Sequence, residues 1–283
     1  MHDRQINETS AIPPLGAGFG GDRHKAALVV EPGQLARTDP FFLLADDHVT
    51  TGGPFGEAHP HAGLETVTFM LEGFMEDGAG RVEEGDVEWM TAGSGIVHNE
   101  GTVVASGMRL FQLWLILPEQ DRNMRPRVQI LKRDDMPVRR EDGVEARVYS
   151  GRSGGATSST LNAVPVTLVD IRLQPGAVFD QELPAAYNGF VVGIAGEASV
   201  GARGAPISAG SVGWTHPVAD GGESRLRLQG GASGARVLLY AGLPQNIRVV
   251  ARGPFIAGSA QELDDYYRRF RHGGFPHAEA LPA

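Results

Sequence analysis

Two short stretches of the chain carry the residue types that bind metal ions. HPHAGLE, residues 59–65, contains His59, His61 and Glu65, and VHNE, residues 97–100, contains His98 and Glu100. Imidazole nitrogens and carboxylate oxygens are ligands for divalent first-row metals. The chain has no cysteine, which excludes thiolate ligands, so any metal must be held by nitrogen and oxygen.

The spacing of these residues predicts how they converge. Residues i and i+2 of a strand point to the same face, so His59 pairs with His61, and His98 with Glu100. If the two strands are neighbours, three imidazoles and one carboxylate meet. That ligand set suits Fe(II) or another divalent first-row metal, and it leaves open positions for water, substrate or O₂. Zinc is an alternative, although structural zinc sites are closed and usually contain sulfur.

Glu65 has three alternative roles. Continued alternation from the histidines places it on their face, and the rest of that face is glycine or apolar, which predicts that it points inward. Glu65 could be a fifth ligand, an acceptor that orients an imidazole N–H, or a buried acid paired elsewhere. We favour the orienting role. The residues expected to share its face are Gly63, Val67, Phe69 and Leu71, and those expected on the other face are Thr66, Thr68 and Met70.

The elements that must hold these residues are short strands. Alternating segments such as AALVVE, ETVTFMLEG, RLFQLWLIL and ARVLLYAGL are separated by Gly, Pro and Asp clusters, and the 39 glycines indicate many tight turns. This pattern predicts an all-β fold. One helix is expected at residues 259–270, SAQELDDYYRRF, where Ser259 and Glu262 form a capping box. We expect it to pack on a barrel wall without taking part in chemistry.

The two halves of the chain share one pattern. In each, an alternating strand ends in glycine (Gly73 or Gly196), a hairpin follows, and then G-x-V-x-W (residues 85–89 or 210–214). A repeated unit of this kind predicts a duplicated barrel. We therefore predict domains at residues 1–125 and 126–283. The first 25 residues are expected to be an irregular lead-in, and the polar segment after Pro118 a linker.

The second half lacks the histidine pattern. Alignment on the shared glycines places Glu182 and Pro184 at the positions of His59 and His61, and Glu223 at the position of His98. We therefore expect the C-terminal barrel to be metal-free, and His216 stands alone there. A hydrogen-bonded structural role is expected for the other histidines, which are His2, His24, His48, His272 and His277.

Charge and hydropathy narrow the class of protein. The formal charge is −9 with no basic cluster, which argues against a nucleic-acid-binding surface. No segment has the length and apolar character of a signal peptide or a membrane span. A cytoplasmic protein without membrane contact is the expectation.

These residues also carry a family resemblance. G-x5-H-x-H-x3-E, residues 53–65, resembles the first cupin motif, and GDVEWMTAGSGIVHNE, residues 85–100, resembles the second motif of the pirin family. RLFQLWLILPEQDR and GPFIAGSAQELDDYYRRF are similar to pirin segments too. The resemblance implies a bicupin, two antiparallel β-barrels of the double-stranded β-helix type with a short C-terminal helix. It also implies iron held by His59, His61, His98 and Glu100.

Two departures from the family pattern concern the pocket. Ala62 stands where the family usually has arginine, and the turn after Leu71 is shorter than usual. Because of these departures, the family pattern specifies the metal more closely than it specifies the substrate.

The resemblance implies a quercetin 2,3-dioxygenase-like enzyme that opens a flavonol ring with O₂. Glu100 would act as general base toward the substrate hydroxyl, and Phe69 and Trp89 would contact a flat aromatic guest. The alternative is an iron-dependent, redox-sensing module that binds a protein partner as a transcription cofactor. A wide pocket mouth favours the enzyme, and a sealed site favours the sensor.

Overall fold

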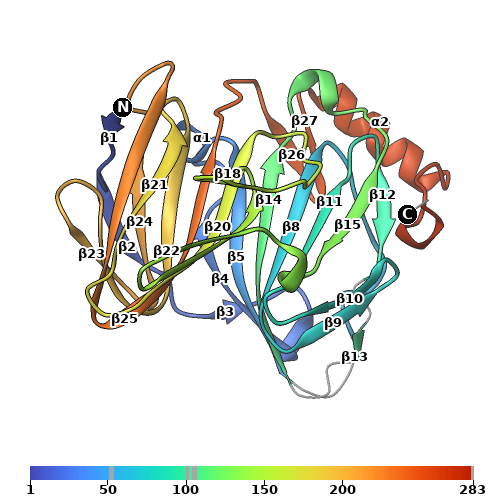
Figure 1. Ribbon diagram of the computed structural model, residues 1–283. Coiled ribbons are helices and arrows are strands. Elements are labelled where there is room, and N and C mark those ends of the chain that lie inside the picture. Colours follow the sequence, from blue (N-terminus) through green and yellow to red (C-terminus); the bar gives the residue numbers. More distant parts are fainter. Residues whose placement is uncertain (51–53, 100–101, 104–106, 282–283) are drawn as a thin grey trace. The chain divides into compact units, whose positions relative to one another are not determined.

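The chain folds into two compact units, each built around one large sheet (Figure 1). The computed structural model describes residues 1–50, 54–99, 102–103 and 107–281. Unit 1 comprises residues 1–13, 36–39 and 135–244, and unit 2 comprises residues 14–35, 40–134 and 245–283. The predicted all-β class is confirmed. The predicted domain division after residue 125 stays a prediction.

Unit 2 contains a seven-stranded antiparallel sheet with the order β15-β11-β8-β14-β5-β4-β3. Its strands are β3 (Gly16–Ala17), β4 (His24–Val30), β5 (Phe41–Val49), β8 (Leu64–Glu72), β11 (Val87–Thr91), β14 (Met108–Ile116) and β15 (Arg127–Leu131). Smaller two-stranded sheets pair β6 (Pro54–Phe55) with β13 (Thr102–Val103), β7 (His59–His61) with β12 (Ile96–His98), β9 (Phe74–Asp77) with β10 (Gly80–Glu83), and β26 (Val250–Arg252) with β27 (Phe255–Ala257).

Unit 1 contains a ten-stranded sheet whose main path is β16-β17-β20-β25-β22-β24-β2. These strands are β2 (Glu8–Ala11), β16 (Val138–Glu141), β17 (Val144–Ser150), β20 (Val166–Leu173), β22 (Asn188–Val200), β24 (Ser211–Thr215) and β25 (Glu223–Gly242). Three more strands pair with this path: β1 (His2–Asp3), β21 (Val178–Pro184) and β23 (Ala205–Ser208). A separate hairpin joins β18 (Arg152–Ser153) to β19 (Ala156–Thr157).

The duplication predicted from the sequence is confirmed by the strand order. In unit 2 the G-x-V-x-W strand β11 lies beside β8, which is followed by β14, β5 and β4; in unit 1, β24 lies beside β22, followed by β25, β20 and β17. The two tryptophans, Trp89 and Trp214, are both buried. One supersecondary pattern therefore builds both sheets.

Two segments expected to be irregular contain strands. The first 25 residues include β1, β2 and β3, and the predicted linker includes β15, which pairs with β11 at the edge of the unit 2 sheet. β2, with the sequence ETSA, is largely exposed. Edge strands carry polar side chains, so they lack the hydrophobic alternation by which central strands are recognised.

The predicted C-terminal helix is confirmed. α2 (Ala260–Arg271) begins after Ser259, whose hydroxyl accepts a hydrogen bond from the Glu262 N–H at 3.2 Å. In Figure 1 it lies beside β26 and β27. The other helices are short: α1 (Leu35–Thr38), η1 (Gly21–Arg23), η2 (Glu119–Asp121), η3 (Arg133–Asp135) and η4 (Ala278–Ala280). Among the described residues, no helix has the length and apolar character needed to cross a membrane.

Candidate metal centre

The three predicted histidine ligands lie on one small two-stranded antiparallel sheet of unit 2, formed by β7 and β12 and called the histidine sheet below. β7 pairs with β12 so that His98 is directly opposite His59, and Ile96 is opposite His61. Opposed residues of antiparallel strands project to the same face, as do residues i and i+2. The predicted convergence of His59, His61 and His98 is thus present in the fold.

The imidazole rings meet at close range. The ring centroids are 4.3 Å apart for His59 and His98, 5.0 Å for His59 and His61, and 5.2 Å for His61 and His98. One nitrogen from each ring lies within 4.8 Å of the other two. The Nε2 atoms of His59 and His98 are 2.9 Å apart.

Backbone carbonyl groups orient two of these rings. Nδ1 of His59 lies 2.7 Å from the Glu57 carbonyl oxygen, and Nδ1 of His61 lies 3.3 Å from that of Pro254. A carbonyl only accepts, so each Nδ1 carries the proton and donates it. Nε2 of each ring is then left with its lone pair, and that of His59 lies 2.9 Å from Nε2 of His98. Fixing the second nitrogen in this way is how proteins select the metal-binding tautomer.

Burial keeps the three imidazoles uncharged at neutral pH. Desolvation lowers the pKa of His61 to about 3, and the proximity of His59 adds to the effect. Desolvation also lowers the pKa of His59, although its bond to Glu57 opposes this, and it lowers that of His98 well below the usual value, with His61 and His59 contributing. Neutral imidazole is the form that binds metals, so none of the three rings must first lose a net positive charge.

The spacing of the nitrogens fits one metal ion. Two ligands about 2.1 Å from a metal and 90° apart would be ~3.0 Å from each other, whereas a tetrahedral angle would require ~3.4 Å. The 2.9 Å between Nε2 of His59 and of His98 matches the first arrangement. Without an ion, the same contact is one N–H···N hydrogen bond in which His98 donates.

Glu100, the predicted fourth ligand and general base, lies outside the described residues. A different carboxylate stands beside the histidines. Glu88 on β11 is fully buried, and its Oε1 is 3.9 Å from Nδ1 of His98, on the side of the ring away from Nε2. We did not single out Glu88 from the sequence. The available signal was one acidic residue within VEWMT, a strand that is otherwise apolar except for its final threonine.

The alternation that we extended from His59 to Leu71 breaks at Gly63. This glycine separates β7 from β8 and has φ +76°, and a Cβ on it would lie 1.8 Å from the Ile256 carbonyl oxygen. Only glycine fits there. Beyond this break, Thr68 lies opposite Gln112, which lines the cavity described below, whereas Glu65 lies opposite Thr91 and Leu115.

Glu65 therefore belongs to the other face of β8, and the role that we favoured for it is not supported. Its Oε1 accepts a hydrogen bond from the Thr91 hydroxyl at 2.6 Å. Phe69 and Trp89 share this face by register, since Trp89 is opposite Val67 and Phe69 is opposite Val87. Both are fully buried, and neither lines the cavity. The structure therefore does not support the predicted contact of these two residues with a substrate in the cavity.

The face of the histidine sheet opposite the three imidazoles packs against the C-terminal elements. Val97 and Ala62 join a buried cluster with Phe255, Leu263 and Phe275. The Val97 N–H donates to the Pro276 carbonyl oxygen at 2.9 Å, and Ala62 accepts from the Ile256 N–H at 3.0 Å. Helix α2 thus packs against the back of the histidine sheet through this buried cluster. Ala62, where the family pattern has arginine, faces this cluster.

A large cavity opens in front of the histidines. It has a volume of about 990 Å³ and is bordered by all three of them. Its main wall consists of alternate residues from three adjacent strands, β4, β5 and β14: His24, Ala26, Leu28, Leu43, Ala45, Asp47, Leu110, Gln112 and Trp114. The Trp114 ring lies edge-on to His61 with a centroid distance of 5.1 Å.

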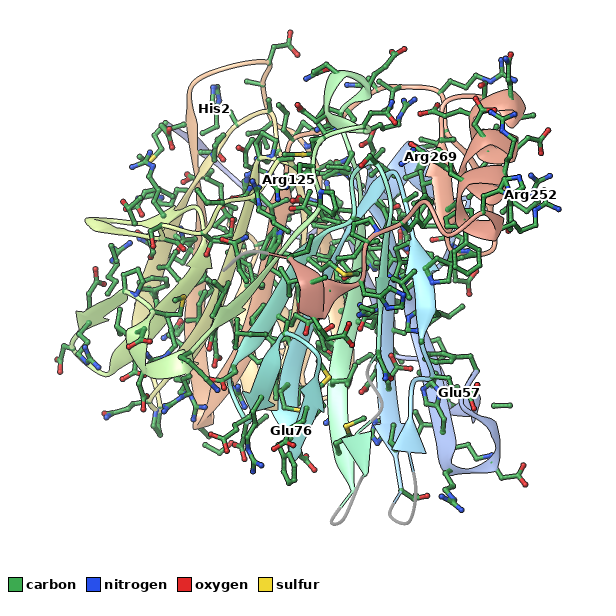
Figure 2. The ribbon with its side chains drawn as sticks, turned by 90° about the vertical axis from the view of Figure 1, so that its right-hand side faces the viewer. His2, Glu57, Glu76, Arg125, Arg252 and Arg269 are labelled. Carbon is green, nitrogen blue, oxygen red and sulfur yellow. The ribbon has the colours of Figure 1, made fainter. Side chains whose placement is uncertain are left out.

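The cavity reaches the surface. Phe19, on the glycine-rich segment before β4, is 71% exposed and yet lines the cavity, and Glu57 and Ala58 at its border are exposed. Figure 2 shows Glu57 at the outer edge of the structure, beside the blue strands. A mostly apolar pocket of this size with a few polar groups is typical of a small-molecule site.

The repeated strand order, the histidine sheet and the cavity define a bicupin, a protein with two cupin domains, which here carries a candidate metal centre in unit 2. Comparison with known families specifies it further. Residues 25–115 match the family described as Pirin, and residues 168–276 match the Pirin C-terminal cupin domain. The chain belongs to the pirin family.

Individual relatives agree with this assignment. The chain is 34% identical to a pirin-like protein of Solanum lycopersicum over 245 residues, which covers 85% of this chain and 83% of the relative. It is similar in structure to GK1651 from Geobacillus kaustophilus, with a TM-score of 0.80, 37% identity and coverage of 87% and 98% of the two chains. A quercetin 2,3-dioxygenase from Acinetobacter baumannii shares the fold, with a TM-score of 0.78, 23% identity and coverage of 96% and 98%.

Proposed function

We propose that this protein is a metal-dependent oxygenase that opens the ring of quercetin or a similar flavonol. The observation that carries the proposal is the cavity, because a group of three neutral imidazoles borders an apolar space that is open to solvent. The fold shared with a quercetin 2,3-dioxygenase supports the substrate class. Fe(II) is the proposed metal, with another divalent first-row ion as the alternative.

His59, His61 and His98 would hold the ion, and Glu100 would complete the set. When bound, the ion supplies Lewis acidity and redox chemistry toward an anionic substrate oxygen and O₂. The chain provides the remaining conditions. Carbonyl oxygens of Glu57 and Pro254 keep two rings in the ligand tautomer.

Two further groups would act on the substrate. Glu100 would accept the proton of the substrate hydroxyl as a general base, so that the substrate binds as an anion. Trp114, with the leucines of β4, β5 and β14, provides an apolar wall that excludes water from a flat aromatic guest. These residues take the place that we had assigned to Phe69 and Trp89.

Incubation of Fe(II)-loaded protein with flavonols, with and without O₂, tests this function. We expect loss of the flavonol absorbance together with stoichiometric O₂ consumption, only when both Fe(II) and O₂ are present. The zinc-loaded protein is the matched control, because zinc can occupy nitrogen and oxygen ligands but has no redox chemistry. Equal flavonol loss with zinc, or none with Fe(II), would refute the proposal.

The competing proposal, a redox sensor that binds a protein partner, receives less support from the open cavity. It predicts a different result in a simple assay. Fe(II)-loaded and Fe(III)-loaded protein would capture different partners from a lysate, whereas identical capture in both states would exclude the switch.

A further inference from the structure

In addition to the three histidines, a carboxylate and an amide face the cavity. Asp47 lies on β5 and Gln112 on the adjacent strand β14, and both line the cavity among mainly apolar neighbours. Polar groups in such a wall are costly unless they are hydrogen-bonded. Each of the two is held by a neighbour that leaves part of its capacity unused.

His24 holds the carboxylate. Its Nδ1 accepts a hydrogen bond from the Gly20 N–H at 3.0 Å, so its Nε2 carries the proton and donates to Oδ1 of Asp47 at 2.6 Å. His24 is fully buried, and Asp47 is 3% exposed. Both ring nitrogens are therefore committed, and the histidine acts on a ligand only through Asp47. Within the described residues, no hydrogen bond is formed to Oδ2 of Asp47.

Thr68 holds the amide. Its hydroxyl donates to Oε1 of Gln112 at 2.8 Å, which assigns the amide orientation and leaves the NH₂ group as a donor. Gln112 lies opposite Ala45, and Asp47 lies opposite Leu110. The two are thus diagonal neighbours on one face of the sheet, with Cα atoms about 7–8 Å apart. A single polar group in the cavity could meet both an acceptor and a donor.

The position of this pair relative to the histidines suits one elongated guest. Trp114 on β14 contacts His61. Leu110, four residues earlier on the same strand, lies opposite Asp47. At ~3.4 Å per residue the Cα atoms of Trp114 and Leu110 are about 14 Å apart. A flat molecule of three linked rings spans such a distance. One end would reach the histidines while the other reaches Asp47 and Gln112.

We propose that Asp47 and Gln112 form a polar subsite that binds a free hydroxyl group on the substrate ring remote from the metal. The hydroxyl donates to Oδ2 of Asp47 and accepts from the Gln112 amide. His24 and Thr68 are positioning residues, because they act through these two groups. The substrate class becomes a flat aromatic molecule with a metal-binding oxygen at one end and an unmethylated hydroxyl at the other. The inference rests on the proposed function for the identity of the reacting end.

Binding of methylated ligands tests the subsite without turnover. Affinities of quercetin and its singly methylated ethers would be measured anaerobically on the metal-loaded protein, by quenching of tryptophan fluorescence or by calorimetry. Methylation removes the hydroxyl donor, so we expect one remote position at which the methyl ether binds at least about tenfold more weakly. Equal affinity for every ether methylated away from the metal-binding oxygen overturns the proposal, and this measurement needs no variant.

Two variants locate the effect. Asp47→Asn removes the charge at nearly constant shape, so the tenfold preference for the hydroxyl should largely disappear. Gln112→Met should weaken the hydroxylated ligand by about threefold to tenfold while retaining the Asp47 pair with His24. The matched control is Asp46→Asn, the neighbouring buried carboxylate, which pairs with Arg109 at 2.8 Å and does not line the cavity. If Asp46→Asn changes the preference as much as Asp47→Asn, the subsite is refuted.

The outcomes separate the subsite from the proposed function. Retained hydroxyl preference without O₂-dependent flavonol loss would remove the oxygenase proposal and keep the subsite. Rapid flavonol loss with no hydroxyl preference would do the reverse.

Discussion

The two units differ in the side chains found at one corresponding pair of strands. β7 and β12 of unit 2 correspond to β21 and the first part of β25 in unit 1, since each pair is antiparallel and β21 precedes β22 as β7 precedes β8. In unit 2 this place presents three imidazoles to a cavity. In unit 1 the end of this strand pair, at Pro184 and Ser224, is hydrogen-bonded by the side chain of Arg4.

Arg4 is fully buried and completely hydrogen-bonded. Its guanidinium donates to the carbonyl oxygens of Pro184, Ala185 and Tyr187, in the connection from β21 to β22, at 2.7–3.1 Å, to the His216 carbonyl at 3.0 Å and to the Ser224 hydroxyl at 2.6 Å. Burial lowers its pKa to about 10, which still leaves it charged at neutral pH. Unit 1 therefore carries a built-in cation at this place.

The comparison indicates why one unit is suited to a ligand and the other to structure. The carbonyl groups around Arg4 already accept hydrogen bonds from its guanidinium, so they are not available as ligands for an external cation. Neutral imidazoles with inward lone pairs have the opposite property, because they are complementary to a cation that the chain does not supply. Three substitutions test this contrast.

The largest effect is expected from His98→Ala. Removing one of three nitrogens should reduce bound metal from about one equivalent to background, measured by metal analysis of the purified protein. His272→Ala, at an exposed histidine after helix α2, is the control and should retain the metal. Stoichiometric metal in the His98 variant would refute the ligand assignment and remove the contrast between the units.

Arg4→Met should have the next largest effect, on stability. It removes the Arg4 donor from four carbonyl oxygens, of which those of Pro184 and Ala185 keep a backbone N–H, so the free energy of unfolding should fall by about 3 kcal/mol in urea denaturation. Metal content should be unchanged, because the metal site belongs to unit 2. Arg140→Ala, whose side chain is 66% exposed, should cost less than about 0.5 kcal/mol. Similar losses in both variants would show that Arg4 is not the structural cation proposed for unit 1.

Glu88→Gln should have the smallest effect, on affinity. The Glu88 carboxyl group lies 3.9 Å from Nδ1 of His98 and can orient this ring when Nε2 binds a metal, so replacing it with an amide should weaken metal binding by about tenfold. Competition with a chelator measures this. Glu76→Gln, at an exposed carboxylate on β9, should leave the affinity unchanged. Loss of binding comparable to His98→Ala would instead assign Glu88 a direct role as ligand.

The same-face arrangement within each histidine strand could be predicted from the sequence because it is local, whereas the pairing of the two strands was an assumption that the structure supports. Two i, i+2 pairs predict two faces, and the opposed pairing of His59 and His98 brings these faces together. The repeat also identified the duplicated sheets. Extrapolation failed at Gly63, where one residue with positive φ interrupts the alternation, so that Phe69 was placed on the wrong face of β8.

The cavity wall could not be predicted because it depends on register between distant strands. Asp47, Gln112 and Trp114 come from strands that are unremarkable by themselves, and their neighbours are set by the pairing of β5 with β14. Arg4 was missed for a similar reason. Its partners are 180 to 220 residues away in the chain, and nothing in the lead-in segment signals that a buried position awaits it.

The location of Arg4 also has a consequence for biosynthesis. β1 and β2 are synthesised long before their partners, because β2 pairs with β24 at residues 211–215 and Arg4 hydrogen-bonds Ser224. These strands must wait, unpaired, until more than two hundred further residues have been translated. At 5–20 residues per second this is a delay on the order of ten seconds or more, during which β1 and β2 remain as unpaired strand edges.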